Sequence, residues 1–194
     1  VLDESLAYLS ALSVFSYGFT TQGELIYPNV DDEWMINEAL EAGVKPVLTL
    51  TPLDVNGRFS NILIHDVLVN EDAVNALLAT VVEREFAGVD VDFEYILAED
   101  RDRFTTFVAR LTETLNQYGY EVSVALAPKT SSDQPGLLYE GKDYGGLGAA
   151  ADHVLLMTYE WGYTYSEPRA VAPVNLVRRV IEYGITEIPS GKID

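Results

Sequence analysis

The stretch Gly88-Val-Asp-Val-Asp-Phe-Glu-Tyr95 alternates apolar and acidic side chains with a strict period of two. On a β-strand this period places Asp90, Asp92 and Glu94 on one face, with successive carboxylates about 6.6 Å apart. Carboxylates this close repel one another, so we expect the most enclosed acid to have a raised pKa and to keep its proton near neutral pH. Such a group can protonate a leaving oxygen.

Short apolar runs on either side of this stretch alternate with amphipathic segments, which is the pattern of βα units in a parallel α/β sheet. The predicted strands are residues 11–17, 45–51, 88–95, 120–127 and 153–159, and the predicted helices are residues 31–42, 70–86, 100–118 and 172–183. A strand inside such a sheet is normally apolar on both faces. Three acids on one strand therefore indicate a functional site rather than a solvated face.

Two segments outside these elements bear on the site. Residues 130–148 are rich in Ser, Asp, Pro and Gly and predict a long loop after the fourth strand, where a parallel α/β fold places substrate contacts. Residues 188–194 predict a turn that leads into a further strand, so the chain is expected to stop within the fold. The loop is a candidate wall of a cleft.

Composition narrows the possible partners. The 194 residues carry 12 basic and 31 acidic side chains, a formal charge of −19, which disfavours nucleic acid and anionic membranes but suits a neutral polymer. The absence of cysteine excludes a thiolate metal site and a cysteine nucleophile. No apolar run approaches the roughly 18 residues of a membrane span, and the first ten residues lack the regions of a signal peptide.

A divalent metal site is an alternative explanation of the acids, because clustered carboxylates suit Mg²⁺ or Ca²⁺. Asp90, Asp92 and Glu94 would then be ligands in a metal-dependent barrel hydrolase. The spacing lacks the glycine turn and distal glutamate of an EF-hand, and His65 and His153 stand in no ligand motif. We expect no cofactor and no metal.

The acidic stretch resembles the signature of glycoside hydrolase family 18, the chitinase family, whose fourth barrel strand carries Asp-Gly-x-Asp-x-Asp-x-Glu. The positions that match are Gly88, Asp90, Asp92 and Glu94, whereas Ala87 replaces the first Asp and Phe93 replaces the Trp common among chitinases. The resemblance implies that Glu94 is the acid/base, that Asp92 holds the substrate acetamido group, and that Asp90 tunes the pKa of Asp92. The substrate's own acetamido carbonyl would be the nucleophile.

Two further segments are similar to the same family. Met157-Thr-Tyr-Glu160 resembles the sixth-strand Met-x-Tyr-Asp, which implies that the Tyr159 hydroxyl binds the acetamido oxygen and that Met157 and Glu160 contact substrate. Phe15-Ser-Tyr-Gly-Phe19 looks like the second-strand Tyr-x-Phe region, which implies sugar contacts from Tyr17 and Phe19.

The resemblance covers nearly the whole chain and implies that residues 1–194 are a partial catalytic domain. The fold would be an incomplete TIM (β/α)8 barrel, about strands two to six, without the first, seventh and eighth. In the family the eighth strand supplies a tryptophan beneath the sugar, and neither Trp34 nor Trp161 can replace it by position. We therefore expect weak or no turnover from this chain alone.

Details such as Phe15-Ser-Tyr-Gly-Phe-Thr20 and Met157-Thr-Tyr-Glu-Trp-Gly162 are similar to the bacterial spore-germination and cell-wall branch of the family. They imply a retaining hydrolase of β-1,4-linked N-acetylglucosamine glycans, peptidoglycan or chitin-like, located outside the cell, in the cell wall or on the spore. The alternative is a non-catalytic, chitinase-like carbohydrate-binding protein. In those proteins the glutamate is typically replaced, so the presence of Asp92, Glu94 and Tyr159 argues against it.

Overall fold

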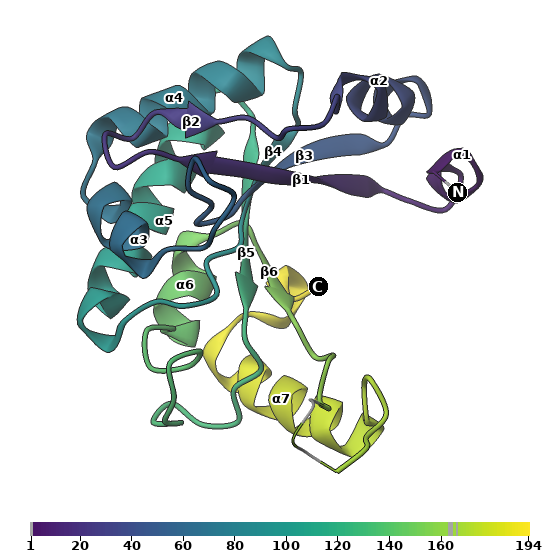
Figure 1. Ribbon diagram of the computed structural model, residues 1–194. Helices are drawn as coiled ribbons and strands as arrows, with labels where there is room; N and C mark the ends of the chain where they lie inside the picture. Colours follow the sequence, from purple (N-terminus) through teal and green to yellow (C-terminus); the bar gives the residue numbers. More distant parts are fainter. Residues whose placement is uncertain (1, 163–164, 166) are drawn as a thin grey trace.

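The computed structural model describes residues 2–162, 165 and 167–194, which form one six-stranded sheet with helices against it (Figure 1). The strand order is β2-β1-β3-β4-β5-β6, with β2 antiparallel to β1 and every other pair parallel. The strands are β1 (Ala11–Phe19), β2 (Leu25–Ile26), β3 (Lys45–Leu50), β4 (Gly88–Val91), β5 (Glu121–Leu126) and β6 (His153–Leu156). This is the parallel α/β arrangement that the sequence predicts.

The helices in chain order are α1 (Leu2–Leu6), α2 (Glu33–Glu41), α3 (Asn61–Leu68), α4 (Glu71–Glu83), α5 (Arg101–Asn116), α6 (Tyr144–Ala150) and α7 (Val174–Glu187), with 3-10 turns η1 (Ala98–Asp100) and η2 (Ser190–Lys192). Local chemistry fixes several of their ends. The Asn70 side chain accepts a hydrogen bond from the Asp72 backbone N–H at 2.9 Å and caps α4. Gly43 and Gly119, with φ of +73° and +82°, follow α2 and α5 in the left-handed conformation that suits glycine.

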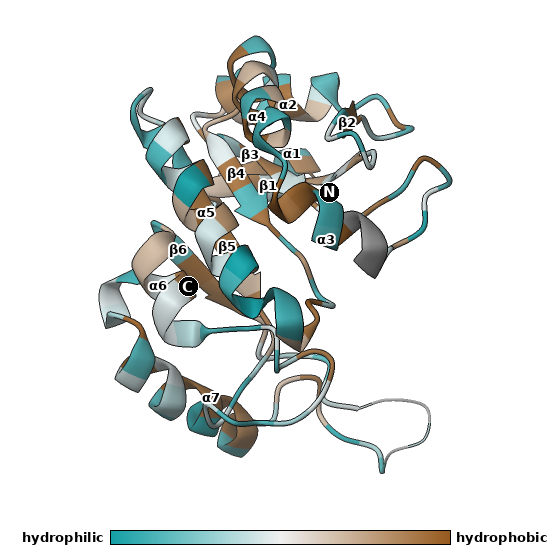
Figure 2. Ribbon diagram, turned by 90° about the vertical axis from the view of Figure 1, so that its left-hand side faces the viewer, coloured by the Kyte–Doolittle hydropathy of each residue, from teal (hydrophilic) through white to brown (hydrophobic). Residues whose placement is uncertain are grey.

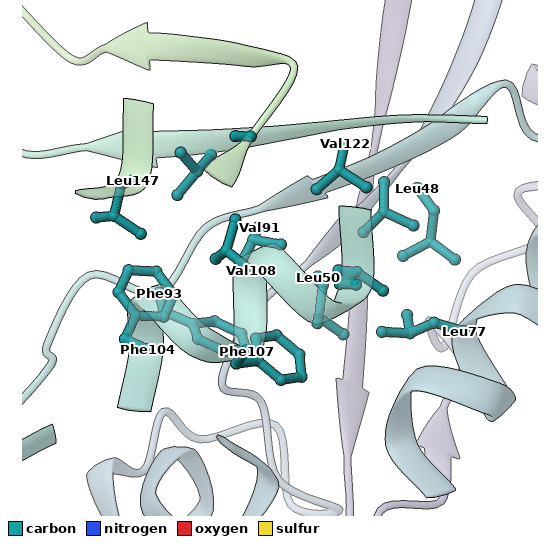
Figure 3. Packing of buried hydrophobic residues seen from close by; sticks show 14 of the residues in the cluster. Leu48, Leu50, Leu77, Val91, Phe93, Phe104, Phe107, Val108, Val122 and Leu147 are labelled. Carbon is teal, nitrogen blue, oxygen red and sulfur yellow. The ribbon is translucent and has the colours of Figure 1, made fainter. Parts of the chain in front are cut away.

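The core lies between the sheet and the helices α4, α5 and α6, which cover one face (Figure 1). Val89 and Val91 of β4 and Phe93 beyond it are completely buried on that face. Phe93 stacks on Phe104 and Phe107 of α5, with ring centroids 5.8 and 6.1 Å apart (Figure 3). The alternation in the acidic stretch therefore separates an apolar face toward α5 from an acidic face on the other side of the sheet.

Four predicted boundaries were wrong by more than two residues, among them the end of α4, which was predicted at residue 86 and lies at Glu83. The ladder of β4 ends at Val91 and that of β6 at Leu156, so 92–95 and 157–159 lie beyond the strands, where the parallel strands give way to loops. Helix α7 continues through Gly184 to Glu187, because this glycine is buried and its missing side chain leaves room for Leu156.

Helix α6 was not predicted, since the sequence from residue 130 to residue 148 reads as one loop. Its composition, Tyr-Gly-Gly-Leu-Gly-Ala-Ala, has low intrinsic helix propensity. A Cβ atom on Gly148 would lie 2.7 Å from the Cγ1 atom of Ile188, and one on Gly146 would lie 2.9 Å from Thr105. Close packing against Ile188 and Thr105 therefore requires glycines in this helix, and these glycines are the reason that the sequence does not predict it. The short helices α1 and α3 and the strand β2 were missed as well.

The end of the chain agrees with the expectation that residues 188–194 lead into a further strand. Ile193 forms a parallel bridge with Val154 of β6, and the Asp194 N–H donates to the Val154 carbonyl at 2.9 Å. Among the described residues, no helix is both long enough and apolar enough to span a bilayer.

Candidate active site

A pocket of about 120 Å³ lies at the carboxyl ends of β1, β3 and β4, the edge at which parallel α/β barrels place their active sites. It is lined by Phe15, Ser16, Thr51, Pro52, Phe59, Asp92, Glu94 and Tyr95. Two of the three predicted acids, Asp92 and Glu94, thus open onto one pocket together with exposed aromatic rings. The pocket joins segments that are far apart in the sequence.

Asp90 lies beneath the other two acids and is only 7% exposed. The Ser123 hydroxyl of β5 donates to its Oδ1 atom at 2.7 Å. Burial raises the pKa of Asp90, although the Ser123 hydrogen bond opposes the change. The most enclosed acid therefore has a raised pKa, as the sequence predicts.

The pKa of Asp92 is raised more strongly than that of Asp90. Burial, followed by the negative charges of Asp90 and Glu94, raises the pKa of Asp92 to about 6, while the ammonium of Lys142 works in the opposite direction. Its Oδ1 atom is buried and has no hydrogen-bond partner within the described part of the chain. A buried acceptor without a donor is costly, so Asp92 carries an unpaired oxygen at the site.

Tyr159 follows β6 and reaches the same acids. Its pKa is raised by burial first and then by the negative charges of Asp92, Glu160, Asp90 and Glu94. Tyr159 is 45% exposed, so part of the residue is open to solvent. The structure therefore brings Tyr159 together with the acidic stretch.

Met157 and Glu160 flank this tyrosine differently. The Met157 N–H donates to the Leu126 carbonyl at 3.0 Å, which extends the contact between β5 and β6 by one residue, and its side chain is half-buried. Glu160 is exposed and has a φ of +59°, a backbone conformation that non-glycine residues seldom adopt. Substrate contacts from these two residues remain predictions.

Tyr17 and Phe19 do not reach the pocket, so the expectation that they contact a sugar was wrong. Tyr17 is completely buried, and its hydroxyl donates to Asp32 at 2.6 Å and accepts from Arg84 at 2.7 Å. Phe19 packs against Phe93, with ring centroids 5.6 Å apart. Both rings belong to the core.

An irregularity in β1 explains the error. The register with β3 shifts between Val14 and Tyr17, so the period of two breaks there. Phe15 is 57% exposed and lines the pocket, although strict alternation would place it on the same face as Tyr17. The segment therefore contributes an aromatic ring to the pocket, and that ring is Phe15 rather than Tyr17 or Phe19.

Two further residues at the site were not predicted. Phe59 lies in the connection between β3 and α3, is 61% exposed, and lines the pocket. Lys142 lies in the loop after β5 and is 1% exposed, and its ammonium donates to the Phe93 carbonyl. Burial lowers the pKa of Lys142 to about 8, against the opposing effect of Asp92 and Glu94. The only sequence signal was the prediction that residues 130–148 form a wall of the cleft.

The alternative of a shared metal ion is not favoured by the geometry. Across the residues that the structure describes, the group whose ligand atoms all lie within 4.8 Å of one another is His65, Glu99 and Asp100. Asp90, Asp92 and Glu94 do not form such a group. Asp100 already accepts from Arg103 at 2.9 Å and contacts His65 at 2.8 Å.

Parallel βα units with carboxyl groups at the carboxyl ends of the strands define a catalytic face of the (β/α)8 barrel type. The family model described as Glycosyl hydrolases family 18 matches residues 54–183, which is more than half of the chain. The chain therefore belongs to glycoside hydrolase family 18.

Individual relatives agree with this assignment. The cortical fragment-lytic enzyme of Bacillus subtilis (strain 168) is 36% identical over 191 residues, which span 98% of this chain and 44% of that enzyme. The spore cortex-lytic enzyme SleL of Bacillus cereus superimposes with a TM-score of 0.92 at 30% identity, over 99% of this chain and 45% of that chain. A chitinase from Chromobacterium violaceum superimposes with a TM-score of 0.93 at 26% sequence identity, over 99% of this chain and 62% of that chain. The chain thus spans about half the length of these curated relatives, and its fold is a section of their barrel.

Proposed function

We propose that the protein is a retaining glycoside hydrolase that cleaves β-1,4-linked N-acetylglucosamine glycans by substrate-assisted catalysis. The observation that carries the proposal is the pair of acids at the pocket. Glu94 lines the pocket, and beside it Asp92 holds a buried oxygen that lacks a donor among the described residues. Membership of family 18 supports the same chemistry.

In the proposed reaction, the protonated Glu94 carboxyl gives its proton to the glycosidic oxygen as the bond from C1 to that oxygen breaks. The carbonyl oxygen of the substrate's acetamido group attacks C1 and forms an oxazolinium ion. Water then attacks C1 from the side that the leaving group vacated, and the bond from C1 to the acetamido oxygen breaks, which restores the acetamido group. Glu94 takes a proton from the attacking water. The two displacements leave the anomeric configuration unchanged.

Asp92 and Tyr159 would hold the acetamido group during these steps. Asp92 accepts the acetamido N–H, and its negative charge stabilises the positive charge that develops on the ring. The Tyr159 hydroxyl donates to the acetamido oxygen and directs it toward C1. The raised pKa of Asp92, about 6, keeps a proton available among the acids close to neutral pH.

Sugar binding would rest on the aromatic rings at the pocket. Phe15 and Phe59 are 57% and 61% exposed and line the pocket with Tyr95. Exposed rings of this kind pack against the apolar faces of sugar rings. A neutral or weakly charged polysaccharide also suits a chain with a formal charge of −19.

We propose peptidoglycan as the first substrate to test and a chitin-like glycan as the second. Support for this order comes from the relatives, since two of them are called cortical fragment-lytic and spore cortex-lytic enzymes. The corresponding location would be outside the cell, in the cell wall or on the spore.

The test is Glu94→Gln, which keeps the size of the side chain and removes the transferable proton. We expect the rate of hydrolysis to fall by about 10²–10⁴-fold, the usual contribution of a positioned acid. Mass spectrometry of the reducing-end sugar released from peptidoglycan and from chitin measures the reaction, and proton NMR of the first-formed anomer tests retention.

Glu113→Gln is the matched control, because Glu113 is exposed on α5. It should hydrolyse at the wild-type rate. Full activity in Glu94→Gln, or an inverted first product, would show that the mechanism is wrong.

A non-catalytic carbohydrate-binding protein is the second candidate, favoured by the two exposed phenylalanine rings at the pocket. It predicts that the wild-type protein binds chitooligosaccharides without product, and that Phe59→Ala weakens binding while Glu94→Gln does not. Release of a new reducing end by the wild type excludes it.

A further inference from the structure

A buried lysine, Lys142, contacts the backbone of the acidic stretch. The Lys142 side chain is completely buried, which is rare for lysine unless its charge is paired. Its ammonium donates to the carbonyl of Phe93, the residue between Asp92 and Glu94, and lies 5.0 Å from the centre of the Phe104 ring. The ammonium therefore holds the backbone at the point where the acidic stretch leaves β4.

The charges that face Lys142 come from that stretch. Among the described residues, the charged groups that act on its ammonium are the carboxyls of Asp92 and Glu94, while α5 contributes the uncharged ring of Phe104. Asp90 and, from the end of β6, Tyr159 interact with Asp92. Lys142 is the one cation that acts on the Asp92 carboxyl in the described chain.

A neighbouring buried lysine provides the contrast. Lys129 is also 1% exposed, but its ammonium donates to the carbonyls of Lys142 and Ser132 at 2.9 and 3.1 Å. The charged groups that act on it are Arg101, Asp143, Glu187 and Asp133. Lys129 thus supports the loop without facing the acids.

We infer that Lys142 is a positioning residue of the active site: its ammonium fixes the carbonyl between Asp92 and Glu94 and is the positive charge that both carboxyls face. The catalytic part of this inference rests on the proposed function. Without that charge, the ionised form of Asp92 loses its compensating partner and keeps the repulsion from Asp90 and Glu94. The pH range in which Asp92 is ionised should then move upward.

The experiment compares two substitutions of the buried lysine in the full chain. Lys142→Met removes both the charge and the hydrogen-bond donor, whereas Lys142→Gln removes the charge and keeps a donor for the Phe93 carbonyl. The Asp92 carboxyl is titrated by carbon-13 NMR of aspartate-labelled protein, with Asp92→Asn to assign its signal. In both variants we expect the titration midpoint to rise by about one pH unit or more, the effect of losing a nearby opposite charge. The acidic limb of the pH–rate profile should move by the same amount.

Lys129→Met is the matched control, because it removes the charge of a second lysine that is 1% exposed and whose ammonium interacts with other charged groups than the acids. Its Asp92 midpoint should stay at the wild-type value. An unchanged midpoint in folded Lys142→Gln, or an equal rise in Lys129→Met, would overturn the inference. If Lys142→Met fails to fold, the glutamine variant decides. If Glu94→Gln hydrolyses glycan at the wild-type rate, the proposed function fails, while the NMR titration still tests the role of Lys142.

Discussion

At the scale of single residues, the raised pKa of Asp92 makes a prediction about stability. The pKa is about 6 in the folded protein and 3.8 in the unfolded chain, so folding is weakened as the pH rises through this interval and the carboxyl ionises in a partly desolvated place. The loss is at most about 3 kcal/mol, at roughly 1.4 kcal/mol per pH unit, and solvent contact with the side chain reduces it. Asp92→Asn removes this pH-dependent loss of folding free energy, because asparagine does not ionise.

The measurement is urea unfolding of the wild type and Asp92→Asn between pH 4 and pH 7. As the pH increases, we expect the free energy of unfolding of the wild type to fall relative to that of Asp92→Asn. Asp133→Asn, at an exposed carboxylate in the loop after β5, controls for the change of net charge. A difference between Asp92→Asn and wild type that does not change with pH would contradict the raised pKa.

The same residues show what the sequence reveals at this scale. Alternation predicted the inward face of Asp90, Asp92 and Glu94, even though the strand ends at Val91, because the extended backbone continues past the last ladder bond. The sugar contact of Tyr17 was implied by the family resemblance and not by alternation, and the structure buries Tyr17 in the core next to an irregularity in β1. Lys142 had no local signal, because only the folded loop brings it against β4.

At the scale of elements, the glycines of α6 make the second stability prediction. A Cβ atom on Gly148 would lie 2.7 and 2.9 Å from two side-chain carbons of Ile188, which is 1% exposed and cannot move aside. We expect Gly148→Ala to destabilise the protein by about 1–3 kcal/mol, the usual cost of overpacking. In the same helix, a Cβ atom on Gly145 meets nothing closer than 3.4 Å.

Gly145→Ala is therefore the matched control, and it should be neutral or stabilising by up to about 1 kcal/mol because alanine has the higher helix propensity. Urea unfolding of both variants gives the comparison. Equal free energies of unfolding in the two variants would mean that α6 does not pack against Ile188 as described.

Helix α6 also marks the limit of element prediction. Helix α5, which has an apolar stripe, was predicted within two residues at both ends, since packing and pattern agree there. Helix α6 is glycine-rich because its neighbours approach closely, so tertiary packing overrides a composition that predicts a loop.

At the scale of the whole molecule, the described chain supplies only part of the walls that the proposed polysaccharide site needs. The pocket at the acids measures about 120 Å³, below the roughly 300–1,000 Å³ of typical ligand sites. Beyond β6, a groove of about 410 Å³ runs between Leu156 and Ile193 and the exposed Ile181 and Ile185 of α7, a helix that carries both hydrophobic and hydrophilic turns (Figure 2). The sheet thus has an apolar surface on the side away from β5.

We therefore predict that residues 1–194 alone turn over glycan weakly, although the acids are in place. Because misplacement of a substrate by about 1 Å costs about 10²-fold in rate, kcat/KM should fall at least that far below the value of a longer relative. The Bacillus cereus SleL enzyme, of which this chain covers 45%, is the reference, assayed on the same cortical fragments. The Glu94→Gln form of the 194-residue chain gives the background rate. Rates equal to those of SleL would show that the described strands alone form a sufficient site.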